Sequence, residues 1–157
     1  MNDILNDLLL EALNSETKAK EFYLDAAKKA KSDAGKKFFT ELSEFEQNHY
    51  EKVKKIIESL NEGCKIEDIN PPQTIAMIKP EIQGEIEPNK DEITTVINLA
   101  IESEKDAQER YTKIAQLVED ETGKEIFTNL AQDESNHQRI LEHQFYQMSN
   151  KGTIIWE

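Results

Sequence analysis

The chain has 157 residues, a formal net charge of −13 at pH 7 and a sequence pI of about 4.7. So acidic a chain is a poor partner for nucleic acid or for an anionic membrane surface, because both recognise clustered Lys and Arg. Charged residues make up 32%, aromatic residues 7%, and there are only 5 Gly and 4 Pro, which favours helices over sheets. The length suits a single domain over residues 1–157.

The first ten residues contain two Asp and no Lys or Arg, whereas a signal peptide needs a basic start. We therefore expect a cytoplasmic protein. From residue 5 onward, mostly apolar residues recur at steps of three and four, which places them in one stripe along a helix. This pattern predicts a bundle helix. Its members are Leu5, Leu9, Ala12, Glu16, Ala19, Tyr23, Ala26 and Ala30.

A polar break at Ser32-Asp33, suited to capping a helix N-terminus, precedes a second stripe. This stripe comprises Gly35, Phe39, Leu42, Glu46, His49, Val53, Ile56 and Leu60. Because the break is so short, the two helices should be antiparallel neighbours. The sequence thus predicts a first helical pair over about residues 2–60.

Residues 61–89 differ in character, since all four prolines of the chain fall there. Continuous helix is disfavoured, and we expect a long crossover connection with a short helix near residues 74–78. The single cysteine, Cys64, lies in this segment and excludes both an internal disulfide and a cysteine-only iron centre. The tail after Gly152 is too short for a domain, and we expect Trp156 to be a packing or interface residue.

A second helical pair is predicted over about residues 90–148, with a break at Asp120-Glu121. Its first stripe is Ile93, Ile97, Ala100, Glu104, Ala107, Tyr111, Ile114 and Val118. Its second stripe is Gly123, Phe127, Leu130, Glu134, His137 and Leu141. The predicted fold is all-α, an antiparallel four-helix bundle made of two hairpins joined by the crossover.

The two hairpins are copies of one another. When the sequence is shifted by 88 residues, Ala12 to His49 align without a gap over Ala100 to His137, with 15 identical pairs in 38 positions. Chance would give roughly two or three matches. An internal duplication, with two units facing each other across a pseudo-two-fold axis, explains the pattern.

Polar residues occupy stripe positions that should be apolar. They are Glu16, Glu46, His49, Glu104, Glu134 and His137. Unpaired buried carboxylates cost several kcal/mol, and no Lys or Arg lies on the stripes nearby. Two divalent cations would balance the four carboxylates, with both histidines neutral.

The spacing agrees with a metal site. Glu46 and His49 are three residues apart, as are Glu134 and His137, so the side chains of each pair reach one centre. One Glu from each of two helices plus Glu-x-x-His from each of the others is the recipe for a carboxylate-bridged dimetal bundle. Mixed carboxylate and imidazole ligands suit iron, with manganese or zinc as other metals that could be loaded.

Two tyrosines follow the single glutamates by two helical turns. Tyr23 and Tyr111 are expected to hydrogen-bond a ligand carboxylate of the facing unit and to tune the metal. Asn48 and Asn136 precede the histidines and are candidates for holding a histidine Nδ1–H.

The ligand-bearing segments resemble the ferritin-like di-iron superfamily, and within it the rubrerythrins, over roughly residues 4–148. The motifs on which this resemblance rests are Ser15-Glu16 with Tyr23, Glu46-Gln47-Asn48-His49, Glu102-Ser103-Glu104 with Tyr111, and Glu134-Ser135-Asn136-His137. The resemblance implies a ferritin-like fold, a homodimer, two iron ions and a non-haem oxidoreductase of oxidative stress that reduces peroxide or O₂. Glu16 and Glu104, assisted by Tyr23 and Tyr111, would then be catalytic.

Two departures from rubrerythrins are visible. The chain has no four-cysteine rubredoxin-like centre, so an external electron donor is needed. Ala107 stands where many rubrerythrins carry an extra glutamate, which predicts a symmetric six-ligand site. Two other functions stay open: an iron-binding storage protein with ferroxidase activity, and a metal-stabilised interaction module.

Overall fold

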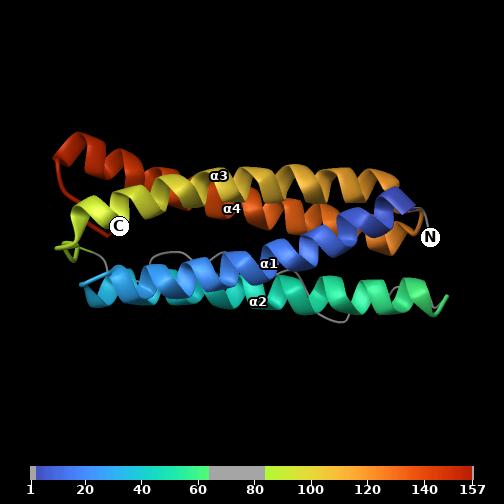
Figure 1. Cartoon of the computed structure of the whole chain (residues 1–157). Helices are drawn as coiled ribbons and strands as arrows, with labels where there is room; N and C mark the ends of the chain where they lie inside the picture. Colours follow the sequence, from blue (N-terminus) through green and yellow to red (C-terminus); the bar gives the residue numbers. More distant parts are fainter. Residues whose placement is uncertain (1–2, 64–83, 157) are drawn as a thin grey trace.

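Four long helices make up the protein in a computed structural model that describes residues 3–63 and 84–156. They are α1 (Asp3–Lys29), α2 (Asp33–Asn61), α3 (Lys90–Leu117) and α4 (Glu121–Lys151). The predicted antiparallel four-helix bundle is confirmed (Figure 1). The α4 helix runs past the expected end at residue 148, and stops where Gly152 adopts a left-handed conformation with φ of 71°.

The helices pair as the short breaks predicted. In Figure 1, α1 lies along α2 and α3 lies along α4, while α1 and α3 are neighbours that run in opposite directions. The α2 helix ends and α3 begins at opposite ends of the bundle. The crossover expected over residues 61–89, with Cys64 and the short helix near residues 74–78, falls largely on residues 64–83, outside the described residues.

Matched caps start the second helix of each hairpin. The Ser32 Oγ accepts a hydrogen bond of 2.9 Å from the Gly35 amide, and the Asp120 Oδ1 accepts one of 2.9 Å from the Gly123 amide. Each cap satisfies an amide that a helix N-terminus would otherwise leave unpaired. The predicted breaks at residues 32–33 and 120–121 are therefore confirmed.

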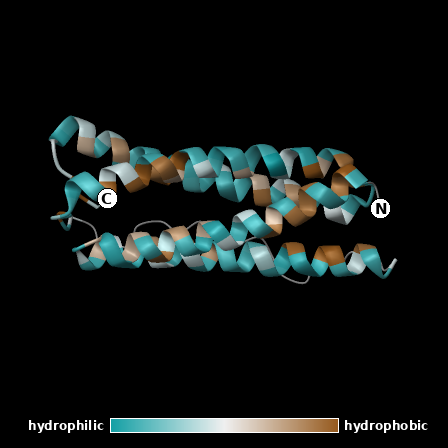
Figure 2. Ribbon diagram, viewed as in Figure 1, coloured by the Kyte–Doolittle hydropathy of each residue, from teal (hydrophilic) through white to brown (hydrophobic). Residues whose placement is uncertain are grey.

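The core consists of two apolar clusters at different levels of the bundle. Along each helix, the residues of one cluster and those of the other lie on opposite sides of the polar stripe positions. Figure 2 shows that hydrophilic residues cover much of the ribbon surface between the hydrophobic ones. In the described part of the chain, no helix combines the length and apolar character that a membrane crossing requires.

The segment after α4 folds back onto the residues that precede α3. Ile155 forms an isolated antiparallel bridge with Ile86, and the Trp156 side chain is fully buried. The Trp156 ring lies 5.0 Å from the Phe38 ring and 5.8 Å from the Phe39 ring. The packing role expected of Trp156 is confirmed.

Glu87 is a buried carboxylate that the sequence did not single out. It accepts hydrogen bonds from the Ser32 hydroxyl at 2.6 Å, the Lys31 amide at 2.9 Å and the Asn89 amide at 3.0 Å. Burial alone would raise the pKa of Glu87, but these hydrogen bonds outweigh it and lower the pKa. The Trp156 indole N–H also donates to the Ser32 Oγ, at 3.1 Å. This network ties the start of α2 to the start of α3 and to the C-terminal segment.

Candidate metal centre

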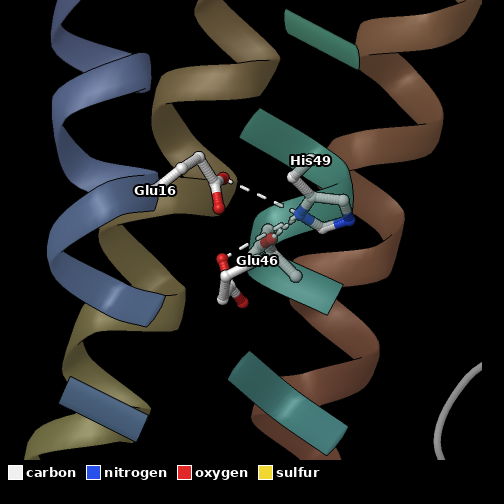
Figure 3. Close-up of side chains that lie close together, drawn as sticks. Glu16, Glu46 and His49 are labelled. Carbon is white, nitrogen blue, oxygen red and sulfur yellow. Dashed lines mark ion pairs between the residues drawn. The ribbon is translucent and has the colours of Figure 1, made fainter. Parts of the chain in front are cut away.

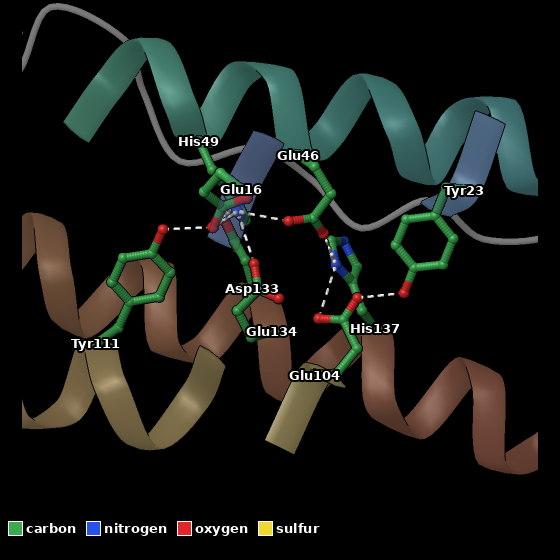
Figure 4. A network of polar contacts seen from close by, with 9 residues as sticks. All are labelled: Glu16, Tyr23, Glu46, His49, Glu104, Tyr111, Asp133, Glu134 and His137. Carbon is green, nitrogen blue, oxygen red and sulfur yellow. Dashed lines mark hydrogen bonds and ion pairs between the residues drawn. The ribbon is translucent and has the colours of Figure 1, made fainter. Parts of the chain in front are cut away.

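The six polar stripe residues converge on one place in the bundle interior. They are Glu16 of α1, Glu46 and His49 of α2, Glu104 of α3, and Glu134 and His137 of α4. Each of the six residues is at most 2% exposed. Figure 3 shows Glu16, Glu46 and His49 pointing toward one another from two helices, and Figure 4 shows the whole cluster.

The cluster divides into two overlapping sets of four residues. One set joins Glu16 and His49 to the pair Glu46 and Glu134, and the other joins Glu104 and His137 to the same pair. Within each set, one ligand atom per residue lies within 4.8 Å of all the others. Glu46 and Glu134 belong to both sets, as expected of carboxylates that bridge two metal ions.

The Nδ1 atoms of both histidines face the carboxylates. His49 Nδ1 lies 2.6 Å from Glu134 Oε1 and 3.7 Å from Glu16 Oε1. His137 Nδ1 lies 3.6 Å from Glu46 Oε1 and 3.7 Å from Glu104 Oε2. The two halves thus present one imidazole nitrogen each to the shared interior.

Buried polar atoms without hydrogen-bond partners test whether these residues fit a metal. Among the described residues, they are Glu16 Oε2, Glu46 Oε1, His49 Nδ1, Glu104 Oε2, Glu134 Oε1, and Nδ1 and Nε2 of His137. Orphaned buried polar atoms are costly and rare, and all of these belong to the six cluster residues. Oxygen and imidazole donors that face one another without mutual hydrogen bonds fit two divalent cations.

The two tyrosines bind the glutamates across the hairpins, as expected. The Tyr23 hydroxyl donates a 2.5 Å hydrogen bond to Glu104 Oε1, and the Tyr111 hydroxyl donates to Glu16 Oε1 (Figure 4). Burial and the nearby carboxylates raise the pKa of both phenols well above 10. Each tyrosine therefore keeps its proton and remains a donor that orients one glutamate.

Protons compensate the crowded negative charge when no cation is bound. Burial raises the pKa of Glu46 and of Glu134 well above 4.5, and the charges of the neighbouring glutamates raise both further. For Glu104, burial would also raise the pKa, but the polar contacts with Glu134 and His137 and the hydrogen bond from Tyr23 outweigh it and lower the pKa to about 2. The site thus favours the protonated form of the two shared glutamates.

The surroundings of His49 favour its charged form when no metal is bound. Burial alone would lower the pKa of His49, but the hydrogen bond to Asp133, the contact with Glu16 and the charges of the carboxylates raise it well above 6.5. Metal binding requires neutral imidazole and ionised carboxylates. The protons held in the metal-free cluster must therefore leave when cations enter.

Asp133 is the polar residue beside the cluster that sequence reasoning missed. Its Oδ2 accepts a 3.1 Å hydrogen bond from His49 Nε2, and its exposed fraction is 7%. The available signal was a mismatch in the repeat, because Phe45 occupies the equivalent position of the first unit. The site is therefore less symmetric than the repeat predicted.

Neither asparagine has the candidate role of holding a histidine nitrogen. Asn48 is exposed to solvent, one residue away from the inward face that carries His49. Asn136 accepts hydrogen bonds from the Arg139 guanidinium and, at 3.2 Å, from the Gln132 amide. The partner of His49 Nε2 is instead Asp133, a residue of the facing hairpin.

A cavity of about 460 Å³ lies between α1 and α3 and reaches the cluster. Glu16, Glu104 and the two shared glutamates line its inner part. Ala19 and Ala107, matched in the repeat, also line it, and both are half-buried rather than packed in the core as their stripe positions predicted. Small side chains at these two positions leave a path from the surface to the carboxylates.

Comparisons with known proteins agree with this geometry. No curated protein matches the chain. A solved structure of a hypothetical protein from Pyrococcus furiosus is 26% identical, with a TM-score of 0.72, and the match covers 93% of this chain and 90% of the other. The rubrerythrin family matches residues 7–144, a range that contains the whole cluster, both tyrosines and Asp133. By its fold and by this match, the chain belongs to the rubrerythrin family.

Proposed function

We propose that this protein is a non-haem di-iron oxidoreductase that reduces hydrogen peroxide or O₂ with electrons from an external donor. The observation that carries the proposal is the buried cluster of four glutamates and two histidines whose inward atoms lack hydrogen-bond partners. Family membership and this donor set fit a di-iron site. Iron bound there would supply two electrons by passing from Fe(II) to Fe(III) at both positions.

The side chains have separate tasks in this proposal. Glu46 and Glu134 hold both metal positions together, while Glu16 and Glu104 each serve one position and face the cavity. Tyr111 and Tyr23 hold one oxygen of Glu16 and Glu104, which leaves the other carboxylate oxygen of each unpaired and directed at the site. A carboxylate anchored at one oxygen can change its contact at the other without leaving the site.

Proton supply matters because reduction of hydrogen peroxide to two waters consumes two electrons and two protons. The buried walls of the site exclude bulk water, and the cavity between α1 and α3 gives small molecules a path. An external donor supplies the electrons in this proposal, which agrees with the single cysteine among these 157 residues, too few for a four-cysteine iron centre. We also expect the chain to act as a homodimer.

The net charge of −13 favours a second candidate, an iron-binding storage protein that oxidises Fe(II). An acidic exterior raises the local concentration of cations. Storage requires a hollow shell of many subunits, so the size of the assembly separates the two functions. A dimer in sedimentation analysis refutes storage, and a cage refutes the stand-alone oxidoreductase.

Reaction with peroxide is the direct test. The chain is loaded anaerobically with Fe(II), mixed with hydrogen peroxide and followed by absorbance in the near ultraviolet. Oxidation of two irons per chain within seconds is expected, and the same result is expected of a control variant at an exposed repeat position, Glu21→Ala. If the irons stay reduced for minutes, the oxidoreductase is refuted, and a metal-stabilised interaction module becomes the better description.

A further inference from the structure

The two halves of the cluster are not equivalent. Across the repeat, Asp133 in the second hairpin corresponds to Phe45 in the first. Asp133 accepts the hydrogen bond from His49 Nε2, at 3.1 Å. Phe45 instead places its ring 5.1 Å from the His137 ring in a T-shaped contact. One histidine is held by a carboxylate and the other by an aromatic edge.

Asp133 prepares His49 to bind a cation. Because the Asp133 oxygen accepts this hydrogen bond, the proton of a neutral His49 imidazole resides on Nε2 and the lone pair on Nδ1. Nδ1 is the atom that faces Glu16 and Glu134. A carboxylate behind an imidazole fixes its orientation and makes it a stronger ligand, and its loss typically weakens metal binding about 10- to 100-fold.

His137 has no such support. Both of its ring nitrogens are buried and lack a hydrogen-bond partner in the described part of the chain. Nothing therefore selects the tautomer that leaves Nδ1 free for the site. The Phe45 ring adds no charge, so this half also lacks the extra negative charge that Asp133 brings to the other.

We infer that the two metal positions load in order. The position formed by Glu16, His49 and the shared glutamates fills first and holds its ion tightly, and the position formed by Glu104, His137 and the same glutamates fills second and exchanges its ion faster. Asp133 is the positioning residue that creates the difference. The inference rests on the dimetal site of the proposed function, but it does not require any reaction with peroxide.

Anaerobic titration of the metal-free chain with Co²⁺, followed by visible absorption and by calorimetry, tests the order. Two steps are expected, separated by about 10- to 100-fold in affinity. Glu16 belongs only to the first set and Glu104 only to the second. Glu16→Ala should therefore remove the tight step, and Glu104→Ala the weak one. Two equal steps, or the reverse assignment, overturn the inference.

Asp133 and Phe45 variants then test the cause. Asp133→Ala should weaken the tight step about 10- to 100-fold and leave the weak step nearly unchanged, while Phe45→Asp should strengthen the weak step. Circular dichroism verifies that each variant keeps its helices, and Glu21→Ala is the exposed control. If Asp133→Ala weakens both steps alike or neither, the inference is wrong.

The outcomes separate this inference from the proposed function. Two ordered Co²⁺ steps in a chain whose iron form ignores peroxide would support the inference and refute the oxidoreductase. Equivalent steps in a chain that reacts with peroxide would do the reverse. A chain that binds no metal refutes both.

Discussion

Tyr23 of the first hairpin donates a 2.5 Å hydrogen bond to Glu104 of the second, in an interior where both residues are at most 2% exposed. Its repeat mate, Tyr111, does the same for Glu16. Each hairpin therefore orients a glutamate of the other. Because burial holds the phenol pKa values well above 10, these contacts persist across the physiological pH range.

Removing one of these hydroxyls should loosen its glutamate. We expect Tyr23→Phe to cost about 1–3 kcal/mol of stability in the metal-free protein, because a buried carboxylate oxygen loses its donor. Metal content should stay near two per chain, since the ligands remain. Thermal unfolding and metal analysis check both, with the 59% exposed Tyr146 changed to Phe as control. An unchanged melting temperature in Tyr23→Phe contradicts the assigned contact.

The shared glutamates should matter most for metal content. Glu46→Ala and Glu134→Ala each remove a side chain common to both sets, so bound metal should fall from about two per chain towards one or none. Elemental analysis of anaerobically purified protein measures this, and Glu109→Ala at an exposed repeat position is the control. Unchanged metal content in both variants would refute the ligand assignment.

The metal-free protein should lose stability as pH rises. The folded state raises the pKa values of Glu46 and Glu134 above 4.5 and that of His49 above 6.5, so it holds protons that the unfolded chain has released. This stabilisation is complete below the unfolded values and is lost as pH rises through the folded ones. The melting temperature without metal is therefore expected to fall as pH rises above 4.5 and onward through 6.5.

The metal-loaded protein should behave in the opposite way, because its ligands must be deprotonated. Metal binding in a weakly buffered solution should release protons, and its affinity should increase with pH. For the metal-free protein, the lowered pKa of Glu104, about 2, gives stability that is lost only in more acidic solution. Glu104 therefore does not mask the fall of the metal-free melting temperature as pH rises. The double variant Glu46→Gln/Glu134→Gln should flatten the pH dependence of the metal-free melting temperature. A profile like that of the unchanged protein would show that the raised pKa values of these two glutamates are not its cause.

Ala107 should control access to the site. Ala107→Leu places a larger side chain in the wall of the cavity that reaches Glu104, so oxidation by peroxide should slow several-fold. Metal content should not change, because Ala107 is not among the six residues. Stopped-flow absorbance measures the rate, and Ala107→Ser, which keeps the space open, is the matched control. Equal rates in the three proteins would mean that peroxide enters elsewhere.

The helical pattern and the repeat predicted most of the fold because both are periodic signals. Stripe spacing located the helices, and the polar breaks located the caps at Ser32 and Asp120. The glutamates and histidines at stripe positions that should be apolar located the six cluster residues. These features are local or repeated, so a sequence alone carries them.

The rest depends on contacts between distant residues. Asp133 is 84 residues from His49, and only the packing of α2 against α4 makes it a partner. Glu87, Ser32 and Trp156 come from three separate segments with no common period. Ala19 and Ala107 look like core alanines by spacing, but the way α1 meets α3 decides that they line a cavity.

The division of the cluster also bears on how such a protein could arise. Each set of four takes three residues from one hairpin and one from the other, and each tyrosine serves the opposite hairpin. A single ancestral hairpin would have held neither a complete set nor its hydrogen-bond donor, so two copies had to associate to complete a set. Joining the copies in one chain replaced an encounter that depended on protein concentration by an intramolecular one. It also freed the two positions 45 and 133 to diverge, which two identical chains could not do.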